Sequence, residues 1–419
     1  MILRMRDIIE QIECGNVPEG YKKTKIGIFP ADWDVYILGD CLSRVENPVE
    51  VKSNELYTQI GIRSHGKGLF YKEPVSGDSL GNKAVFWIEP NCFILNIVFA
   101  WEQAIGKTTQ AEVGMIGSHR FPMYRPINNK VDIDYLIAYF LTKRGTDLLQ
   151  AASPGGAGRN KTLGQNRFLK SKIILPPIEE QQKIAAILTT QDKVIELKEK
   201  LLAEKQRQKK YLMQVLLTGK KRLSGFNGDW EIHTLDKHLK ESRVPGGSGL
   251  TARKLTVRLW NKGVVEKNEI HQGSQSTAYY RRSAGQFIYS KLDFLNCAFG
   301  IIPIKLDGFE TTQDLPCFDV FNINKEYLLY YVTQEHFYKH FGALANGGRK
   351  ARRVNPEDLL RFYIKYPSLE EQSAIVQALS TADHEIDLLQ QGLEQEKQKK
   401  KALMQLLLTG IVRTNHDSF

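Results

Sequence analysis

Two stretches of the chain, 184–216 and 375–407, place hydrophobic residues alternately four and three positions apart, with polar residues between them. This heptad pattern is the one with which one helix packs along another. It predicts two long helices whose seams face a partner helix. The predicted seam residues are Ile184, Leu188, Ile195, Leu202, Ile375, Leu379, Ile386 and Leu393.

The two stretches are copies of one another. A constant shift of 191 aligns 176–219 with 367–410 without a gap, and 20 of the 44 positions are identical. Each copy opens with proline and a Glu-Glu-Gln triplet, where acidic residues complement the helix dipole. Each ends in Leu-Leu-Thr-Gly, whose glycine is typical of a helix C-terminus. We expect the copies to pack on each other as an antiparallel pair. A homodimeric coiled coil, with each copy pairing across chains, is the alternative.

The repetition extends into the segments before the helices. A Phe-x-x-Asp-Trp motif occurs at 29–33 and again at 226–230, and Tyr135 matches Tyr327. The shift falls from 197 to 191 along the chain, as small deletions would make it. The sequence therefore predicts two copies of a domain-plus-helix unit. The predicted segments are a helical N-terminus (1–20), a first domain (21–175), a central helix (176–219), a second domain (220–366), a distal helix (367–410) and a tail (411–419).

Each domain has the pattern of a mixed α/β fold. Short apolar runs at 84–88, 92–99, 285–290 and 297–304 predict strands, and the runs at 134–141 and 326–332 predict amphipathic helices. A last strand at 172–175 or 361–365 then leads into the long helix. The expected fold class is thus mixed α/β, with two similar globular domains and an antiparallel pair of long helices.

Charge and cysteine content narrow the function classes. The net charge is +11 and the pI is about 9.2, which favours an anionic partner such as nucleic acid. The five cysteines are odd in number and have no Cys-x-x-Cys spacing, which argues against a disulfide framework or a zinc site and favours the reducing cytoplasm. The most apolar run, 92–101, is far shorter than the roughly 20 residues of a membrane span.

A glycine-rich basic loop precedes the last strand of each domain, at 153–162 and 346–353. The first loop fits the phosphate-binding P-loop pattern except that Asn160 stands where the second glycine is needed, so we do not expect a nucleotide site. A glycine turn followed by Arg, Lys or Asn suits contact with DNA phosphates and base edges. An ordinary basic surface loop is the alternative. With two further basic clusters, the candidate DNA-binding residues are Arg63, Lys67, Gly155, Gly156, Arg159, Asn160, Lys161, Arg281, Arg282, Gly347, Gly348, Arg349, Lys350, Arg352 and Arg353.

Catalytic motifs are missing from the sequence. It contains no Asn-Pro-Pro-aromatic motif of an adenine methyltransferase, no Walker A motif and no convincing nuclease carboxylate–lysine cluster. We therefore predict no catalytic residue, no bound cofactor and no metal site. The apolar ends of the long helices either close the bundle or contact another subunit. The candidates for such contact are Leu212, Met213, Leu216, Leu403, Met404 and Leu407.

Taken in order, these motifs resemble the specificity subunits of type I restriction–modification systems, over nearly the whole chain from Tyr21 to Gly410. The resemblance implies two target-recognition domains that each recognise one half of a bipartite DNA sequence, spaced by the helices. It also implies two methyltransferase subunits and, optionally, restriction–translocase subunits as partners. S-adenosylmethionine, ATP and Mg²⁺ would then be bound by the partners.

Three alternatives stay open at this stage. The first is the specificity subunit of a fused restriction–methylation system that cuts on both sides of its site. The second is a coiled-coil adaptor without DNA binding, whose interactions would not weaken steeply with salt. The third, an RNA-binding repeat protein, would need stacking aromatics at RNP-like spacing, which the sequence lacks.

Overall fold

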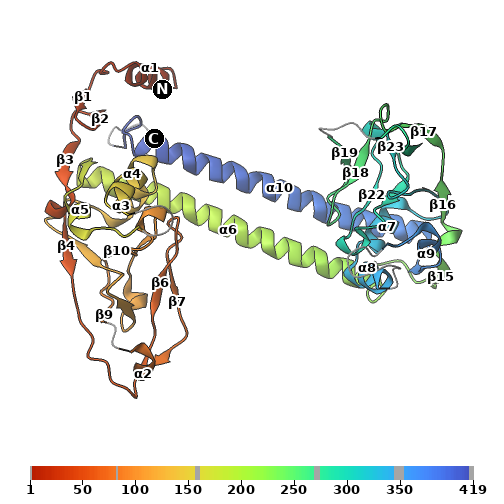
Figure 1. The fold of residues 1–419 in the computed structure, drawn as a ribbon, viewed down its shortest axis with the longest axis horizontal. Coiled ribbons are helices and arrows are strands. Elements are labelled where there is room, and N and C mark those ends of the chain that lie inside the picture. The colour runs from red at the N-terminus through yellow and green to blue at the C-terminus, as the bar shows by residue number, and fades with distance from the viewer. Residues whose placement is uncertain (1, 82–83, 156–160, 269–273, 344–352, 415–419) are drawn as a thin grey trace. The chain divides into compact units, whose positions relative to one another are not determined.

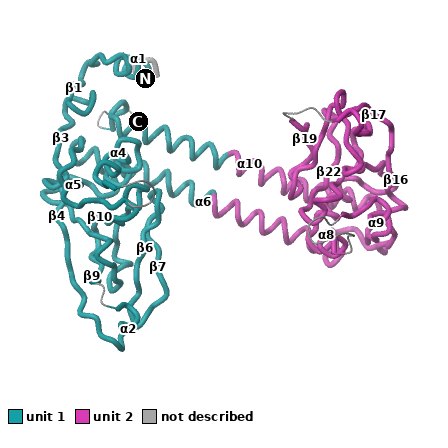
Figure 2. The backbone as a smooth tube through the Cα atoms, viewed as in Figure 1, with its two compact units in different colours: residues 1–198, 392–419 teal, residues 199–391 magenta. Residues whose placement is uncertain are grey.

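The computed structural model describes residues 2–81, 84–155, 161–268, 274–343 and 353–414. It divides into two compact units, which Figure 2 colours separately: unit 1 comprises 1–198 and 392–419, and unit 2 comprises 199–391. Helices α6 (Ile178–Leu216) and α10 (Leu369–Leu407) each belong to both units. Unit 1 thus holds the start of α6 and the end of α10, and unit 2 holds the start of α10 and the end of α6.

Unit 1 begins with helix α1 (Ile2–Glu13) and then alternates short strands with short helical turns (Figure 1). Its strands are β1 (Tyr21–Thr24), β2 (Gly27–Pro30), β3 (Asp34–Ile37), β4 (Leu42–Val45), β5 (Leu56–Tyr57), β6 (Ile60–Ile62), β7 (Leu69–Tyr71), β8 (Val75–Ser76), β9 (Val85–Trp87), β10 (Phe93–Leu95), β11 (Ile105–Lys107), β12 (Ile116–Ser118), β13 (Met123–Pro126) and β14 (Lys172–Leu175). Its short helices are η1 (Leu38–Asp40), α2 (Gly77–Leu80), η2 (Ala100–Glu102), η3 (Gln110–Glu112), α3 (Ile133–Phe140), α4 (Lys143–Ala151) and α5 (Gln165–Leu169).

Unit 2 follows the same general order of elements between the two long helices. Its strands are β15 (Glu231–Thr234), β16 (Leu239–Ser242), β17 (Pro245–Ser248), β18 (Leu255–Val257), β19 (Val264–Glu266), β20 (Ala278–Arg281), β21 (Phe287–Tyr289), β22 (Phe299–Ile301), β23 (Glu310–Thr311), β24 (Cys317–Val320) and β25 (Tyr363–Tyr366). Its short helices are η4 (Leu235–Lys237), η5 (Phe294–Asn296), η6 (Ile304–Leu306), α7 (Lys325–Val332), α8 (Glu335–Gly342) and α9 (Pro356–Leu360).

The two units share one scaffold. An antiparallel four-stranded sheet has the order β11-β10-β13-β4 in unit 1 and the matching order β22-β21-β24-β16 in unit 2. The strand that precedes each long helix pairs with an early strand of the same unit, β14 with β3 and β25 with β15. Aromatic residues fill both cores, among them Phe93 and Tyr124 in unit 1 and Phe287 and Tyr289 in unit 2, all fully buried. The mixed α/β class and the internal repeat are confirmed.

Helices α6 and α10 pack on each other within the chain. In unit 1, Lys400 pairs with Asp192, and Lys198 pairs with Glu396 at 2.9 Å. Because the numbers rise along one helix while they fall along the other, the helices run antiparallel. The intramolecular pair is therefore what the structure shows, in place of the homodimeric coiled coil.

The seam residues are buried most where the helices meet the domains. Ile184, Leu188, Ile375 and Leu379 are at most 4% exposed and join the cores of their own units. Ile386 and Leu393 are also buried, and Ile195 and Leu202 are half-buried. The polar bands along the same helices form cross-helix ion pairs, which in unit 2 join Lys205 to Glu385 and Lys209 to Asp383.

The repeated Glu-Glu-Gln triplet has a structural role beyond the helix dipole. Glu180 is fully buried and accepts hydrogen bonds from Arg413 (2.8 and 2.9 Å) and from the indole of Trp33 (3.1 Å). In unit 2, Glu371 binds Arg222 in the equivalent way. Each arginine lies just after the end of the other long helix. The triplet therefore fastens the start of one helix to the chain that leaves its neighbour.

The next residue of the triplet holds the domain. Gln181 accepts a hydrogen bond from the backbone of Asp132 and donates to the carbonyl of Lys130. Gln372 accepts from Asn324 in the same manner. Both glutamines are buried, so their amides satisfy backbone groups that would otherwise be left unpaired at the start of α3 and α7.

Two of the predicted strands are too long, 92–99 and 297–304, and the second forms β22 only over Phe299–Ile301. The apolar run 92–99 forms β10 only as far as Leu95, and Asn96 then accepts a hydrogen bond from the amide of Val98. Asparagine favours such local turns over strand pairing. The chain thereby turns into η2, which proves important for the candidate site.

Candidate nucleic-acid interface and partner grooves

A tight turn at 63–68, here called turn 1, joins β6 and β7. The amide of Arg63 donates to the carbonyl of Gly68 at 3.0 Å, which closes the turn. The next two contacts fix it to the end of η2: the amide of His65 donates to the carbonyl of Glu102 (2.8 Å), and that of Gly66 to Gln103 (2.9 Å). The turn is therefore held on the domain by backbone contacts.

Unit 2 contains the same turn at 258–263, here called turn 2, between β18 and β19. The amide of Arg258 donates to Gly263 (2.9 Å) and that of Trp260 to Asn296 (2.8 Å). The amide of Asn261 donates to Cys297 (2.9 Å). Every bond is the counterpart of one in turn 1 at a shift of 194 or 195.

The basic residues of the turns also match. Arg63 and Lys67 in turn 1 correspond to Arg258 and Lys262 in turn 2, and all four are exposed. The guanidinium of Arg63 also donates to the carbonyl of Leu69 and lies 5.0 Å from the centre of the Phe70 ring, so it is held against the hairpin. Each unit thus presents two exposed cations at the tip of one hairpin.

The glycine-rich basic loops approach the same segment from its other end. The amide of Leu163 donates to the carbonyl of Ile97 (2.8 Å), and in unit 2 that of Val354 donates to Lys291 (3.2 Å). Lys161 lies 5.3 Å from the centre of the Trp101 ring in η2. In each unit, then, one short segment, 97–103 or 291–297, anchors both the hairpin turn and the end of the loop.

The remaining predicted DNA-binding residues are placed less uniformly. Gly155 and Arg353 are exposed, and Arg353 lies 3.8 Å from Asp314. Arg281 is exposed on β20. The other loop candidates fall outside the described residues: Gly156, Arg159, Asn160, Gly347, Gly348, Arg349, Lys350 and Arg352.

Arg282 is a correction. Its side chain is 2% exposed, and its guanidinium donates to Thr311 (2.7 Å) and to the carbonyl of Ser242 (2.6 Å). Burial lowers the pKa of this arginine. Arg281, the last residue of β20, is exposed, whereas the next residue, Arg282, points into the domain, a distinction that a basic doublet in the sequence does not reveal. Arg282 therefore holds strands together and has no access to DNA.

Turn 2 was not predicted from the sequence as the equivalent of turn 1. The signal was available, because the two segments share Arg-x-x-x-Lys-Gly at a constant shift of 195. This shift lies between the values of the flanking repeats. Two basic residues and a glycine are a weak motif alone, and their bonds to η2 and η5 give them weight.

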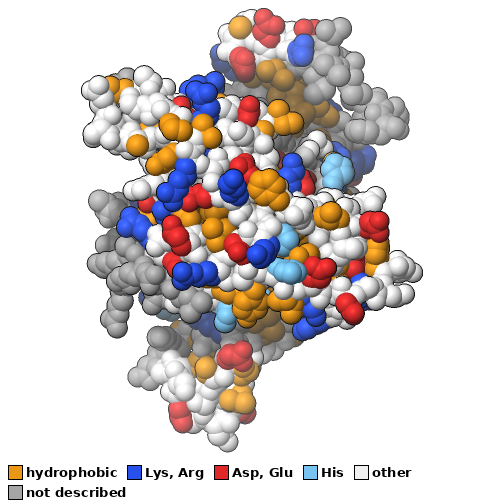
Figure 3. Space-filling model, turned by 90° about the vertical axis from the view of Figure 1, so that its right-hand side faces the viewer, with side chains coloured by type: hydrophobic (Ala, Val, Ile, Leu, Met, Phe, Trp, Pro, Cys, Tyr) orange, Lys and Arg blue, Asp and Glu red, His pale blue; other side chains and the backbone are white. Residues whose placement is uncertain are grey.

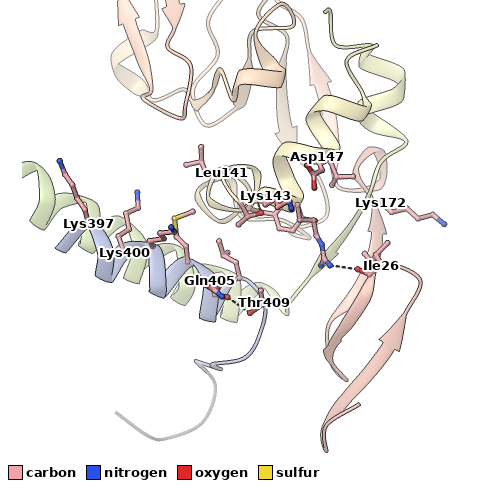
Figure 4. Close-up of a pocket in the computed structure, with 16 residues that line it drawn as sticks. Ile26, Leu141, Lys143, Asp147, Lys172, Lys397, Lys400, Gln405 and Thr409 are labelled. Carbon is pink, nitrogen blue, oxygen red and sulfur yellow. Dashed lines mark hydrogen bonds between the residues drawn. The ribbon is translucent and has the colours of Figure 1, made fainter. Parts of the chain in front are cut away.

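A second kind of site lies beside the end of α10 in unit 1 (Figure 4). This first groove has a volume of about 970 Å³, and its apolar lining includes Leu141, Met404 and Leu408. Its basic rim consists of Lys143, Arg144, Lys172, Lys397, Lys400 and Lys401, with Asp147 as the one acid among the lining residues. Arg144 also donates to the carbonyl of Ile26, another lining residue, at 2.7 Å.

Unit 2 has the equivalent groove, of about 570 Å³, beside the end of α6. Met213 corresponds to Met404, and Lys209 and Lys210 correspond to Lys400 and Lys401. The short helix opposite differs in charge, since Glu335 and His336 stand where unit 1 has Lys143 and Arg144. Burial lowers the pKa of His336, so this rim carries less positive charge than the first.

The predicted partner-contact residues divide into two groups. Met213 and Met404 line the grooves and are half-buried, as are Leu212 and Leu403. Leu216 and Leu407 are 3% and 2% exposed inside the cores of their own units. These two leucines are therefore unavailable to another subunit, because the helix ends also close the domain cores.

Charge by itself does not mark a binding face. On the side shown in Figure 3, Lys and Arg side chains lie interspersed with Asp and Glu side chains. Across the described ranges, no group of three or more His, Cys, Asp or Glu side chains could hold a metal ion. Over those same ranges, no helix is both long and apolar enough to cross a membrane. The repeated geometry, more than net charge, therefore identifies the candidate sites.

Comparison with known proteins agrees with this arrangement. A family model described as the type I restriction modification DNA specificity domain matches residues 32–207 and 261–397, one segment for each copy of the repeat. The chain belongs to this family. It is a DNA target-recognition subunit of the type I restriction–modification class.

Relatives cover almost the whole chain. Two type I restriction enzyme specificity subunits of Methanocaldococcus jannaschii are similar to it: MjaX is 25% identical, covering 94% of this chain and 97% of the relative, and MjaVIII is 24% identical, covering 93% and 95%. The alternatives of an adaptor and of a fused restriction–methylation system receive no support from these matches.

Solved structures show the same fold. The HsdS subunit of Thermoanaerobacter tengcongensis superposes with a TM-score of 0.52 at 17% identity, covering 92% of this chain and 98% of that one. The type I S subunit of M. genitalium gives 0.54 at 11% identity, covering 90% and 96%. The two-domain fold with its pair of long helices is thus shared at low sequence identity.

Proposed function

We propose that this specificity subunit recognises a bipartite sequence in double-stranded DNA, with one half contacted by each unit. The observation that carries the proposal is the duplicated set of turn, η segment and basic loop on one scaffold. A fixed scaffold with differing surface residues suits the recognition of two different half-sites. The predicted loop residues within 156–160 and within 346–352 remain candidates for this contact.

The chain itself would carry out no chemistry. We propose that methylation depends on S-adenosylmethionine bound by methyltransferase subunits, and that ATP and Mg²⁺ serve restriction subunits where these exist. The four buried free cysteines, Cys41, Cys92, Cys297 and Cys317, suit a protein of the reducing cytoplasm.

The two grooves are the proposed docking sites for two methyltransferase subunits. The occupant that fits the first groove is an amphipathic helix, with apolar residues over Leu141 and Met404 and acidic residues facing the lysine rim. The second groove offers the same apolar centre with a mixed rim. Equivalent grooves in equivalent units favour two copies of one partner.

Mapping of methylated adenine tests the proposed function. The gene would be expressed with its neighbouring methyltransferase gene, and the genome would be compared with that of cells that lack it. A new motif of two short defined halves around an undefined gap is the expected result. If the two proteins form a stable complex yet no new motif arises, recognition of DNA by this chain is contradicted.

Pull-down of the methyltransferase tests the grooves. Met404→Asp, and separately the charge reversal Lys143→Glu with Lys401→Glu, should weaken capture, whereas Gln395→Asp on the same helix outside the groove should not. Met213→Asp should act likewise on the second copy and reduce the number of bound subunits. Equal capture by all these variants would exclude the grooves.

A further inference from the structure

The residue in the middle of each turn is an exposed aromatic ring held in a rare backbone conformation. His65 has φ of 61° and Trp260 has φ of 58°, at equivalent positions. Non-glycine residues seldom occupy this left-handed region, and for a residue as bulky as tryptophan it is a genuine outlier. Such strain persists only where the surrounding structure enforces it. Here the amide of His65 donates to Glu102 of η2, and the amide of Trp260 donates to Asn296 of η5.

Neither ring is needed for the core. Trp260 is 57% exposed, and His65 is exposed as well. Tryptophan and arginine are both enriched among the residues that contribute most to binding. An exposed tryptophan between an exposed arginine and an exposed lysine therefore indicates a binding site. The same ring-between-cations arrangement occurs in both units although the ring itself differs.

The packing beneath the turns shows that this position is fixed. Gly106 and Gly300 lie under the hairpins, and a Cβ at Gly300 would come within 2.5 Å of Val264 in β19. In unit 2 the absence of a side chain at Gly300 lets the hairpin lie close against the central sheet, whereas a Cβ at Gly106 would make an ordinary contact, at 3.4 Å from Leu69. One acidic side chain also lies here in unit 1, Glu102, which accepts a hydrogen bond from Ser64. Its counterpart in unit 2 is the neutral Asn296.

From these observations, and resting on the proposed DNA recognition, we propose that turns 1 and 2 are equivalent DNA-contact elements. Arg63 with Lys67, and Arg258 with Lys262, bind backbone phosphates on either side of the ring. The ring enters a groove of the DNA and contacts a base. His65 can donate or accept a hydrogen bond there, whereas Trp260 offers an apolar face and one N–H donor. The shared cations give position, and the differing rings contribute to the difference between half-sites.

The test uses the complex with the methyltransferase and a DNA duplex that carries the mapped target, with affinity measured at several salt concentrations. Each phosphate contact contributes about 0.9 to the slope of log affinity against log salt. The double variant Arg258→Ala with Lys262→Ala should therefore lower the slope by about two. The matched control Lys237→Ala with Lys240→Ala removes two exposed cations of unit 2 elsewhere and should leave the slope unchanged.

The ring is tested separately. Trp260→Ala should weaken binding of the target about tenfold, within the range of one base contact, with a much smaller effect on unrelated DNA. Trp260→His should keep the salt slope but relax or alter the second half-site in the methylation map, and leave the first unchanged. Trp260→Gly, which also relieves the strained φ, guards against a folding defect and should resemble Trp260→Ala.

The outcomes separate this inference from the proposed function. If the wild-type complex binds its target with a steep salt dependence and the turn variants match the wild type, the turns are not DNA contacts although the function stands. If the turn variants lose methyltransferase capture instead, the turns bind protein and the inference is wrong. If the wild-type complex shows no salt-dependent binding, both fail.

Discussion

The central sheet has the same strand order in unit 1 and unit 2, but the strands beside it differ. Unit 1 adds the pairs β5–β8 and β9–β12, whereas unit 2 adds the three-stranded sheet β17-β20-β23. The parts that match are those that bury aromatic residues, hold the long helices or anchor the turns. The comparison teaches that this duplicated protein keeps its frame and its anchoring bonds, while its exposed strands and rings are free to diverge.

The helix-start clusters should show the largest difference between the units. Glu180 binds both Arg413 and Trp33, whereas in unit 2 the indole of Trp230 has no partner among the described residues, and Arg222 lies over its ring instead. For Arg413, burial would lower the pKa, but the hydrogen bonds to Glu180 and Asp32 outweigh it and raise the pKa. We expect Glu180→Ala to destabilise unit 1 by about 2–4 kcal/mol, because it removes the acceptor of the buried Trp33 indole and leaves Arg413 with Asp32 as its remaining carboxylate partner.

Denaturant unfolding followed by tryptophan fluorescence and hydrogen exchange measures this effect. Glu179→Ala, in the same helical turn but exposed, is the control and should change little. Glu371→Ala should act on unit 2 and by less. If the exposed and buried glutamates behave alike, the cluster is not what fastens the helix.

The glycines under the hairpins give a second contrast. A Cβ at Gly300 would lie 2.5 Å from Val264, whereas one at Gly106 would lie 3.4 Å from Leu69. Gly300→Ala should therefore cost about 1–3 kcal/mol through overpacking, and Gly106→Ala clearly less. Thermal unfolding of both variants checks this. Equal losses would mean that the hairpins adjust equally well.

A pH dependence should appear in unit 2 only. His238 is 3% exposed, and Cys41 occupies the equivalent place in unit 1. Burial lowers the pKa of His238, against the hydrogen bond to the carbonyl of Phe321, while His233, Asp236 and Glu231 lie nearby. The unfolded chain therefore takes up the proton first, and stability falls as the pH drops below the ordinary histidine pKa of about 6.5.

Hydrogen exchange of unit 2 peptides between pH 7.5 and 5.5 measures that loss. His238→Cys, which copies unit 1, should reduce the dependence and leave the share of His336, whose pKa burial also lowers. An unchanged profile in this variant would assign the acid sensitivity to other groups.

The smallest effects should come from the cross-helix ion pairs. Asp192→Ala removes the partner of Lys400 in unit 1, and a partly exposed pair contributes at most about 1 kcal/mol. Asp383→Ala should cost more, because it also removes the acceptor of the Tyr330 hydroxyl at 2.7 Å. A double-mutant cycle with each lysine gives the two coupling energies directly. A reversed order would show that the tyrosine contact adds no stability.

The sequence by itself determined the helix pair, the repeat and the class of fold. Heptad spacing is local information, and a gap-free repeat at a shift of 191 needs no coordinates to be seen. It also pointed to Arg63 and Lys67 as exposed cations. The prediction of Arg282 as a DNA contact was wrong, because a basic doublet in the sequence does not show which of the two neighbours faces the core.

Only the tertiary structure brought together residues that are distant along the chain. Glu180 and Arg413 are 233 positions apart, and their bond exists because α6 and α10 run antiparallel in unit 1. The equivalence of turn 1 and turn 2 likewise became visible through hydrogen bonds to η2 and η5, since two cations and a glycine are common in any surface loop. Patterns along the chain fix which elements form, whereas long-range contacts decide which side chains those elements bring to one place.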